Sequence, residues 1–419
     1  MRRPRTRLLG GILARTAALA AALAAALTGC AAGSAAPAPG LDPADWPGVL
    51  NAARGRTLDW YLSRGDDAIN AVVDGYVTDR LAENGITLNV VPVADIADAV
   101  DKALGERQAD RTADGTVDAI WINGENFAAG KQAGLWYCGY PAALPNARYV
   151  DLADPAVATD FGVPVDGCEA AWQRAHSALV YDSAQLGESD VASLVTLTDW
   201  ARSHPGRFTY PAPPDSTGSM VVRTFLYGTA GDPSVLAGPF NEELYAQVAD
   251  RLWPRLNALE RSLWRGGATY PTSQDAVEQL YATGEIAAFF TYGPGVVGNR
   301  VADGTYPPTT RTAVPSIGNI SDVSSVAIPA NSPDVAAALV LANLLQDPQT
   351  QLRFYADASV YPVIDLNRTD PGVRQQFAAV SRSPAVLPVE ELAARALPEL
   401  NQRYVTAAQD GWTAQVLQR

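Results

Sequence analysis

Two short polar segments contain the residues best suited to hydrogen-bond a ligand. The first, Asn123-Gly124-Glu125-Asn126, follows the apolar run at 117–122 (VDAIWI) and precedes a helical stretch. In open parallel sheets, ligands bind where strands end and helices begin. The amides of Asn123 and Asn126 can hydrogen-bond a polar ligand there, and Glu125 can pair with a cation. The alternative is that Asn123 caps the helix while Glu125 stabilises its positive end.

The second segment, Asp215-Ser216-Thr217-Gly218-Ser219, opens a helix after three prolines. Its hydroxyls, the free N–H groups of a helix start and a glycine that permits close approach form a cradle for a polar or anionic group. Helix capping alone would need only one of these hydroxyls. The segment is not a nucleotide-binding P-loop, because the GxxxxGK[ST] spacing and its lysine are absent.

Arg64 is a candidate directly after the first strand-like run, in Ser63-Arg64-Gly65-Asp66. Its guanidinium can clamp a carboxylate or a phosphate with two parallel hydrogen bonds. It can equally pair with Asp66 or Asp67 on the surface, and the sequence leaves both alternatives open.

Two aromatic and two polar residues complete the candidate set. Tyr292, at the end of an apolar run and before Gly-Pro, can form a wall against a ring or a cation, and Trp264 is the second choice. Most aromatic residues in a chain of this size belong to the core, which is the alternative for both. Ser321 and Asp322 precede the strand-like run SSVAIP and are weaker candidates.

The same inventory argues against an enzyme. Serine hydrolysis needs a nucleophile, a base and an orienting group. His176 and His204 are the only imidazoles, neither lies near an exposed-nucleophile motif, and no G-x-S-x-G occurs. An H-E-x-x-H zinc pattern is also absent. A glycosidase that uses carboxylates alone is the enzyme class left open.

Hydrophobic patterns predict a scaffold of alternating strands and helices for these residues. Strands separated by helices of about 10–15 residues indicate βαβ units and a mostly parallel sheet. The first region has strand-like runs at 56–62, 86–93, 117–122 and 178–181, with helical stretches at 68–81, 96–104 and 191–203. The second, from the Pro-rich loop 210–214 on, has strands at 285–292 and 324–329, with helices at 221–227, 241–263, 335–345 and beyond 389. The prediction is an α/β fold of two lobes with a helical tail.

The N-terminus has the pattern of an export signal followed by a lipidated cysteine. Residues 1–7 are basic, and residues 16–27 are almost wholly Ala and Leu, a run too short to span a membrane stably. Leu27-Thr28-Gly29-Cys30 resembles the bacterial lipoprotein signal, which implies cleavage before Cys30 and a lipid such as palmitate on its thiol. The alternative is ordinary signal cleavage with Cys30 uninvolved. Residues 31–47, small and Pro-rich, are expected to form a flexible spacer.

With Cys30 set aside, Cys138 and Cys168 remain as an even pair in an oxidising compartment, where a disulfide is the default. Closing a loop of about 30 residues stabilises a fold by roughly 3–4 kcal/mol in the chain-entropy description. The alternative is two buried free thiols. A shared metal site is disfavoured, because no CxxC or clustered His accompanies the pair.

Composition limits the partners. At 419 residues the chain suits two domains, each with its own core. Without the signal, 26 basic residues face 45 acidic ones, a net charge of about −19. Such a surface repels nucleic acid, so nucleic-acid binding is not expected.

The order and spacing of several short segments resemble a known family over most of residues 48–419. These segments are Trp121–Phe127 (WINGENF), Leu144–Asn146, Ala178–Asp182, Pro214–Ser219, Leu263–Arg265, Gly284-Glu285, Tyr292–Pro294 and Val326–Pro329. Together they resemble the extracellular solute-binding lipoproteins of ABC importers, of the family-1 type, and most closely a subgroup described as thiamine-type binders. At Arg64 the chain departs from the subgroup, which has an aromatic residue and Gly-Gly there.

The resemblance implies a type II periplasmic-binding fold, in which two α/β lobes joined by a hinge close on a ligand in a central cleft. The chain would cross between lobes near 178–182 and 310–314, with a structural role for His176 beside the hinge. The expected domains are a lipoprotein signal (1–29), the lipidated cysteine and linker (30–47), lobe I (48–178 with 311–345) and lobe II with C-terminal helices (179–310 with 346–419).

The implied function is that of a lipid-anchored substrate-binding component on the outer face of the cytoplasmic membrane. It would capture a small organic solute, thiamine-like or another cationic or polar compound, and deliver it to permease and ATPase subunits, as a monomer without cofactor or catalysis. Ferric-iron binders of this fold use adjacent Tyr-Tyr pairs, and this chain has none, so no metal is expected. The alternatives are a lipid-tethered sensory or interaction module using the same cleft and, less favoured, a secreted hydrolase.

Overall fold

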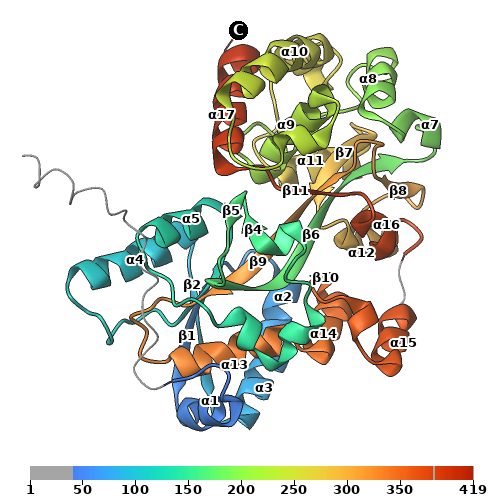
Figure 1. Cartoon of the computed structure of the whole chain (residues 1–419). Helices are drawn as coiled ribbons and strands as arrows, with labels where there is room; N and C mark the ends of the chain where they lie inside the picture. Colours follow the sequence, from blue (N-terminus) through green and yellow to red (C-terminus); the bar gives the residue numbers. More distant parts are fainter. Residues whose placement is uncertain (1–40, 381–382, 419) are drawn as a thin grey trace, which may run out of the picture. The chain divides into compact units, whose positions relative to one another are not determined.

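The structure, a computed structural model, describes residues 41–380 and 383–418 (Figure 1). The expected signal, Cys30 and most of the spacer lie outside these residues. Residues 35–419 group into one compact unit. Within the described residues, no helix has the length and apolarity that crossing a bilayer requires.

A mixed sheet of nine strands connects the described elements. Its main path runs β10-β6-β9-β3-β1-β2, with β7 and β8 paired to β6 and β11 paired to β9. β1 is parallel to β2 and β3, whereas β9 is antiparallel to β3 and β6. The strands are β1 (Thr57–Leu62), β2 (Thr87–Pro92), β3 (Ala119–Ile122), β6 (Glu169–Asp182), β7 (Ala288–Tyr292), β8 (Thr310–Ala313), β9 (Asn319–Ala327), β10 (Tyr361–Pro362) and β11 (Ala396–Pro398), and β4 (Thr159–Asp160) and β5 (Val163–Pro164) form a separate hairpin.

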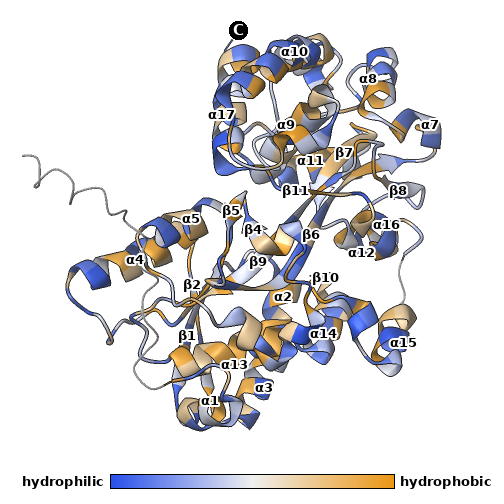
Figure 2. Ribbon diagram, in the orientation of Figure 1, coloured by the Kyte–Doolittle hydropathy of each residue, from blue (hydrophilic) through white to orange (hydrophobic). Residues whose placement is uncertain are grey.

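Lobe I contains the parallel strands, and the alternating side chains of these strands pack into two hydrophobic cores. Leu58, Trp60 and Leu62 of β1 point into one core and Tyr61 into the other, as the two-residue period of a strand requires. Because α13 is apolar on all sides, it is buried almost completely (Figure 2). The helices of this lobe are α1 (Trp46–Ala53), α2 (Asp67–Val72), α3 (Thr78–Glu83), α4 (Ile96–Gln108), α5 (Gly124–Gln132), α6 (Pro155–Ala158), α13 (Val335–Leu345), α14 (Pro348–Ala358) and α15 (Pro371–Ala379).

Lobe II packs helices around β7 and the second half of β6. On α10, Val248, Leu252, Leu256 and Leu259 recur at helical spacing and face this core. The helices here are α7 (Glu188–Val191), α8 (Leu194–Ser203), α9 (Ser216–Ala230), α10 (Glu242–Glu260), α11 (Gln274–Ala282), α12 (Gly295–Ala302), α16 (Val389–Ala393) and α17 (Gln402–Trp412). The two-lobed α/β architecture predicted from the sequence is confirmed. The prediction of a mostly parallel sheet is wrong, because β6 pairs antiparallel with all its neighbours and β9 is antiparallel to β3.

The long strands β6 and β9 pass between the lobes, and the lobe boundaries therefore differ from the expected ones. β8, where the sequence placed the second crossing, pairs with the lobe II half of β6, and the crossing lies along 319–323 instead. Phe354 and Ala358 of α14 belong to the lobe I core, so packing assigns 346–380 to lobe I rather than to lobe II. The apolar pattern of α14 does not say which core the helix faces.

Cys138 and Cys168 form a disulfide, as the sequence predicts. The bond joins positions 30 residues apart and encloses the β4–β5 hairpin. Close to the bond, Gly139 N–H donates to the Gly167 carbonyl at 2.8 Å.

Candidate functional site

The paired segments 173–177 of β6 and 319–324 of β9, here named the hinge ribbon, present two chemically different faces. Ala175 lies opposite Asp322, and His176 lies opposite Ser321. Neighbouring residues of a strand point to opposite sides, so Asp322 and Ser321 face away from each other. The sequence pattern predicts a strand that begins after these two residues. Because β9 begins at Asn319, both residues lie within it instead.

On the Asp322 face, two carboxylates meet the start of α5. The Asn123 amide donates to Asp322 Oδ2 at 2.9 Å, and the Gly124 N–H donates to Asp160 Oδ1 at 2.8 Å. Asn123 occupies the N-cap position, but its side chain makes no capping hydrogen bond. Asp160 fills that role, and Asn123 instead connects β3 to the hinge ribbon.

Lobe II contributes a buried ion pair to the same face. Arg223 on α9 donates to both carboxylate oxygens of Glu399, at 2.8 and 2.9 Å. It also donates to Ser219 Oγ at 2.5 Å and to the Tyr292 hydroxyl at 3.1 Å. The Tyr292 hydroxyl in turn donates to Glu399 at 3.0 Å. Arg223 thus makes four hydrogen bonds to three residues, Ser219, Tyr292 and Glu399. Asn123, Asp160, Arg223, Tyr292, Asp322 and Glu399 are named here the interlobe cluster.

Asp160, Glu169 and Asp322 on this face have no ion pair with an arginine or lysine among the described residues, unlike Glu399. Burial, with Glu399 nearby, raises the pKa of Asp322 to about 7. Burial and neighbouring carboxylates also raise the pKa of Asp160 and of Glu169, which follows the disulfide on β6. In the described ranges neither Asp160 Oδ2 nor Glu169 Oε2 has a hydrogen-bond partner. Buried carboxylates of one sign gathered in this way mark functional sites more often than structural ones.

The β4–β5 hairpin carries Asp160 to this position and continues into lobe II. Phe161 at its tip has a left-handed backbone (φ 43°), which bulky residues rarely adopt. Its ring lies about 3.4 Å from the position a Cβ on Gly124 would take, and it packs against the lobe II core. Its carbonyl accepts from the Gln402 N–H at 3.2 Å. The hairpin therefore links the start of α5 to the start of α17.

Of the other predicted residues, Glu125 lies at the same edge, where Gln402 donates to it at 3.2 Å, and Asn126 is half-buried on the first turn of α5. Ser219 joins the interlobe cluster through Arg223 and also accepts from Gln409 at 2.9 Å. Thr217 is buried, and Ser216 is exposed.

Asp215 and Gly218 have structural explanations. Asp215 caps α9, accepting from the Thr217 and Gly218 N–H groups at 2.9 Å each. A Cβ on Gly218 would lie 2.1 Å from the Pro211 carbonyl oxygen, so the glycine is required for packing. The first turn of this helix is therefore satisfied by its own segment.

Arg64 and Trp264 lie apart from the interlobe cluster. Arg64 forms a two-fold ion pair with Asp74, at 2.6 and 2.5 Å, rather than with either aspartate considered from the sequence. This contact holds the pKa of Asp74 below its usual range. Trp264 donates to Glu285, before β7 begins, and Arg265 stacks over its ring, whereas Tyr292 lies at the opposite end of that strand.

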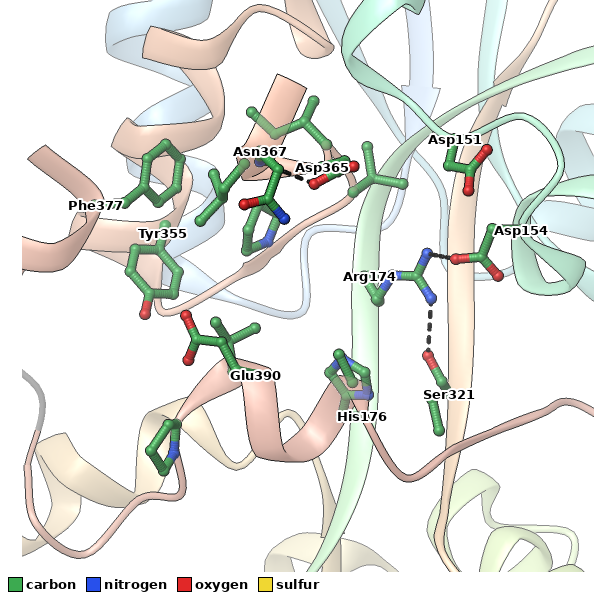
Figure 3. A pocket seen from close by; sticks show the side chains of 18 of the residues that line it. Asp151, Asp154, Arg174, His176, Ser321, Tyr355, Asp365, Asn367, Phe377 and Glu390 are labelled. Atoms are coloured by element: carbon green, nitrogen blue, oxygen red, sulfur yellow. Dashed lines mark hydrogen bonds and ion pairs between the residues drawn. The ribbon is translucent and has the colours of Figure 1, made fainter. Parts of the chain in front are cut away.

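The other face of the hinge ribbon borders a cavity of about 1240 Å³ (Figure 3). Figure 3 shows Arg174 between Asp154 and Ser321, to which it donates at 2.6 and 3.4 Å. Tyr355 and Phe377 lie on the opposite wall. Ser321, predicted as a ligand residue, therefore belongs to this cavity and not to the interlobe cluster. The charge of the partly buried Arg174 is paired with that of Asp154 at 2.6 Å.

Asp160, Phe161, Arg223 and Glu399 are not predicted from the sequence. Arg223 follows Ser219 by one helical turn, and that spacing on a helix was the available signal. Glu399 lies 176 residues beyond Arg223, and nothing local to either residue indicates the contact.

The chemistry of the interlobe cluster is recognition by charge and hydrogen bonds. In residues 41–380 and 383–418, no three His, Cys, Asp or Glu side chains are grouped so as to hold a metal ion. The cluster combines carboxylates, amides, a tyrosine hydroxyl and a paired arginine, drawn from both lobes and from the ribbon that joins them.

A two-lobed α/β fold with polar groups converging beside its crossing strands defines a class of binding protein, and sequence comparison agrees. The profile described as "bacterial extracellular solute-binding protein" matches residues 75–374. The chain belongs to this family.

Individual relatives match over most of the chain. The chain is 34% identical to Protein YnjB of Escherichia coli (strain K12) over 372 residues, which cover 88% of this chain and 93% of that one. An ABC transporter structure from Clostridium perfringens ATCC 13124 superimposes with a TM-score of 0.62 at 15% identity, covering 86% of this chain and 99% of that one. A periplasmic thiamin binding protein gives a TM-score of 0.52 at 15% identity, covering 85% and 96%. At such identities the structures show the fold alone.

Proposed function

We propose that this protein is the lipid-anchored substrate-binding component of an ABC importer. It captures a small organic solute between its two lobes and presents it to a membrane permease coupled to an ATPase. Thiamine-like compounds, and other cationic or polar compounds, are the first candidates, because a thiamin-binding protein shares the fold and the cluster is rich in carboxylates.

One observation carries the proposal: the interlobe cluster draws hydrogen-bonding groups from both lobes and the hinge ribbon to one place. Asn123 ends a strand of lobe I, Tyr292 ends a strand of lobe II, and Asp322 lies on β9 between them. A solute that contacts all three favours the closed arrangement of the lobes, because only that arrangement offers every contact.

The proposed address rests on the segment Leu27–Cys30. Export followed by lipidation of Cys30 would retain the protein at the outer face of the cytoplasmic membrane. Residues 31–40 would serve as the spacer that lets the lobes open and close beside the permease; the expected end of the spacer at 47 is too late, because Leu41 and Trp46 pack against the lobe I core. We propose the lobe boundary indicated by packing, with 346–380 in lobe I and 383–418 in lobe II.

The binding proposal is tested by thermal unfolding of purified residues 31–419 with vitamins, polyamines, amino acids, organic anions and sugars, thiamine and its phosphates first. One compound class should raise the melting temperature in a concentration-dependent way, because a ligand that binds the folded state stabilises it. If no small solute stabilises the protein and a partner protein does, solute capture is excluded and an interaction module is favoured.

Two substitutions test the location. Asn123→Ala and Tyr292→Ala should each weaken solute binding about tenfold or more in calorimetry, because each removes a hydrogen-bonding group. Both variants should retain the wild-type far-ultraviolet circular dichroism. Unchanged affinity in both would remove the interlobe cluster as the site.

The anchor is tested separately in cells. Labelling with an alkyne-bearing palmitate analogue should mark the wild-type protein and not Cys30→Ala, and the variant should leave the membrane fraction. Labelling that persists in Cys30→Ala would contradict lipidation at this residue without affecting the solute proposal.

A further inference from the structure

We propose that Asp160, Asp322 and Phe161 form a subsite for an ammonium group, so that the captured solute is an organic cation. The inference rests on the proposed function and specifies the chemistry of its ligand. Asp160 and Phe161 are the new elements of the site, and both come from the β4–β5 hairpin.

The first support is uncompensated charge. In the described part of the chain, no Arg, Lys or His forms an ion pair with Asp160, Asp322 or Glu169. The charge of Lys131 acts on Glu169 and that of Arg223 on Asp322, but both cations form ion pairs elsewhere: Lys131 with Asp166 at 2.6 Å, and Arg223 with Glu399 at 2.8 Å. A buried charge without a partner is costly, and proteins retain such groups where a ligand supplies the partner.

The second support is geometry. Asp160 and Asp322 accept hydrogen bonds from consecutive residues, Gly124 and Asn123, so their carboxylates meet at one junction. Asp160 is only 5% exposed, yet its Oδ2 has no partner among the described residues. Asp322 is half-buried and uses Oδ2 for Asn123 and Oδ1 for the Val323 N–H. An ammonium N–H donor at this junction would satisfy the free oxygen and neutralise the pair.

The third support is the ring beside these carboxylates. Phe161 follows Asp160 directly and lies against Gly124, which brings an aromatic ring to the same junction. Strained backbone of this kind concentrates at ligand clamps, where surrounding structure holds it in place. The face of an aromatic ring attracts cations, above all when both are desolvated. Carboxylates and a ring together select an organic cation over a neutral polar compound.

The test compares cations with neutral compounds of the same shape. The probes are 2-aminoethanol with 1,2-ethanediol and 1,4-diaminobutane with 1,4-butanediol, together with any compound found by the thermal screen and its uncharged analogue. Binding to residues 31–419 is measured by calorimetry. The cationic member that binds should do so at least about 30-fold more tightly than its neutral counterpart, as expected for a desolvated charge pair.

Substitutions then locate the charge recognition. Asp322→Asn should weaken the cation at least about 30-fold while leaving a neutral analogue within about twofold. Phe161→Leu keeps the apolar volume and should weaken the cation by about threefold to tenfold. Asp79→Asn removes the same charge from an exposed helix position and is the matched control, with no change beyond about twofold. Asp160→Asn is a second carboxylate variant should Asp322→Asn fail to fold.

The possible outcomes separate this inference from the proposed function. Capture of a neutral or anionic solute, with affinity unchanged in Asp322→Asn, overturns the ammonium subsite and leaves solute capture in place. Equal losses in Asp322→Asn and Asp79→Asn would reduce the effect to net charge and overturn it as well. Failure of every compound to bind overturns both. Cation-selective binding lost in Asp322→Asn and kept in Asp79→Asn supports it.

Discussion

The two faces of the hinge ribbon treat buried charge in opposite ways. On one face Arg174 is matched by Asp154, and its second guanidinium nitrogen reaches Ser321. On the other face, Asp322 accepts a hydrogen bond from the Asn123 amide, and Arg223 forms its ion pair with Glu399 and not with Asp322. Ser321 and Asp322 are adjacent on β9, yet they belong to different regions. The region of Ser321 contains a paired arginine, whereas the region of Asp322 lacks a positive charge for its carboxylate.

The difference shows that cavity volume is a poor guide to this site. The large cavity of Figure 3 lies on the face whose partly buried arginine is paired. In a structural ion pair, both charged groups belong to the protein, whereas a recognition site contains polar groups that are paired only when a ligand binds. The interlobe cluster contains both kinds of group. Arg223 and Glu399 form an ion pair, here named the closed pair, and Asp160 and Asp322, here named the open carboxylates, have no ionic partner among the described residues.

Breaking the closed pair should have the largest effect. Arg223→Met leaves Glu399 buried without its cation, and we expect the free energy of unfolding to fall by about 3–5 kcal/mol. Urea unfolding followed by circular dichroism measures it. The double variant Arg223→Met/Glu399→Met should recover most of the loss, because two apolar side chains replace two charges. A loss below about 1 kcal/mol in the single variant would mean that the pair is not buried in solution.

Removing the disulfide should rank second. Cys138→Ala/Cys168→Ala should lower the free energy of unfolding by roughly 3–4 kcal/mol. Without the bond, the loop of about 30 residues is no longer closed, and the unfolded chain gains conformational entropy. The same urea titration measures it, with reduced and alkylated wild-type protein as the control. Wild-type stability in the variant would show that the cross-link is dispensable.

Removing an open carboxylate should stabilise the ligand-free protein, unlike either change above. Burial raises the pKa of Asp322 from 3.8 to about 7, so between these values the folded protein binds more protons than the unfolded one. Unfolding free energy is therefore lost as pH rises from about 4 to 7. Asp322→Asn removes this loss, so its stability relative to wild type should rise by about 2 kcal/mol across the window. A lone group would give about 1.4 kcal/mol for each pH unit, and the smaller total is expected because Asp160 and Glu169 interact with Asp322.

The measurement is the difference between the two unfolding free energies from pH 4 to 8. Titrations of groups that do not interact with Asp322 cancel in that difference. His176, whose pKa burial lowers to about 4, favours folding as pH rises, and Asp118, whose pKa burial raises to about 6, acts in the opposite direction. Arg223 and Tyr292, the remaining charged or titratable neighbours, keep their protonation over this range. A difference that is flat with pH would contradict a buried, uncompensated Asp322.

The smallest effect is expected one residue away. Ser321→Ala removes a hydroxyl that faces the cavity, and solute affinity should change by less than about twofold, against the large loss in Asp322→Asn. Calorimetry with one solute measures both. A loss in Ser321→Ala as large as that in Asp322→Asn would move the solute to the Arg174 face.

The elements were predictable where the pattern is local. The apolar run of α13 gives its bounds at Val335 and Leu345, and β3 ends where the WINGENF segment begins. Asn123, Tyr292 and Asp322 follow from the rule that ligands meet strand ends, although Asp322 lies within a strand. Its partner Asn123 is 199 residues away, and such a contact leaves no trace in either segment.

Charge compensation was the part that the sequence could not predict. Arg64 and Arg223 are both arginines near candidate loops, yet one pairs on the surface with Asp74 and the other is buried against Glu399. Which carboxylate meets which cation depends on tertiary packing. Asp160 and Asp322 can be recognised as carboxylates without an ionic partner only when the partners of Lys131 and Arg223 are known.

The disulfide has a consequence for when the protein becomes competent. Cys138 and Cys168 enclose the hairpin that carries Asp160 and Phe161, and this bond forms only where oxidants are present. A newly made chain in a reducing cytoplasm lacks that tether, and we expect its hairpin to be poorly held. The chain would then acquire full affinity only after crossing the membrane. A scavenger built in this way does not withdraw the solute from the cell that synthesises it.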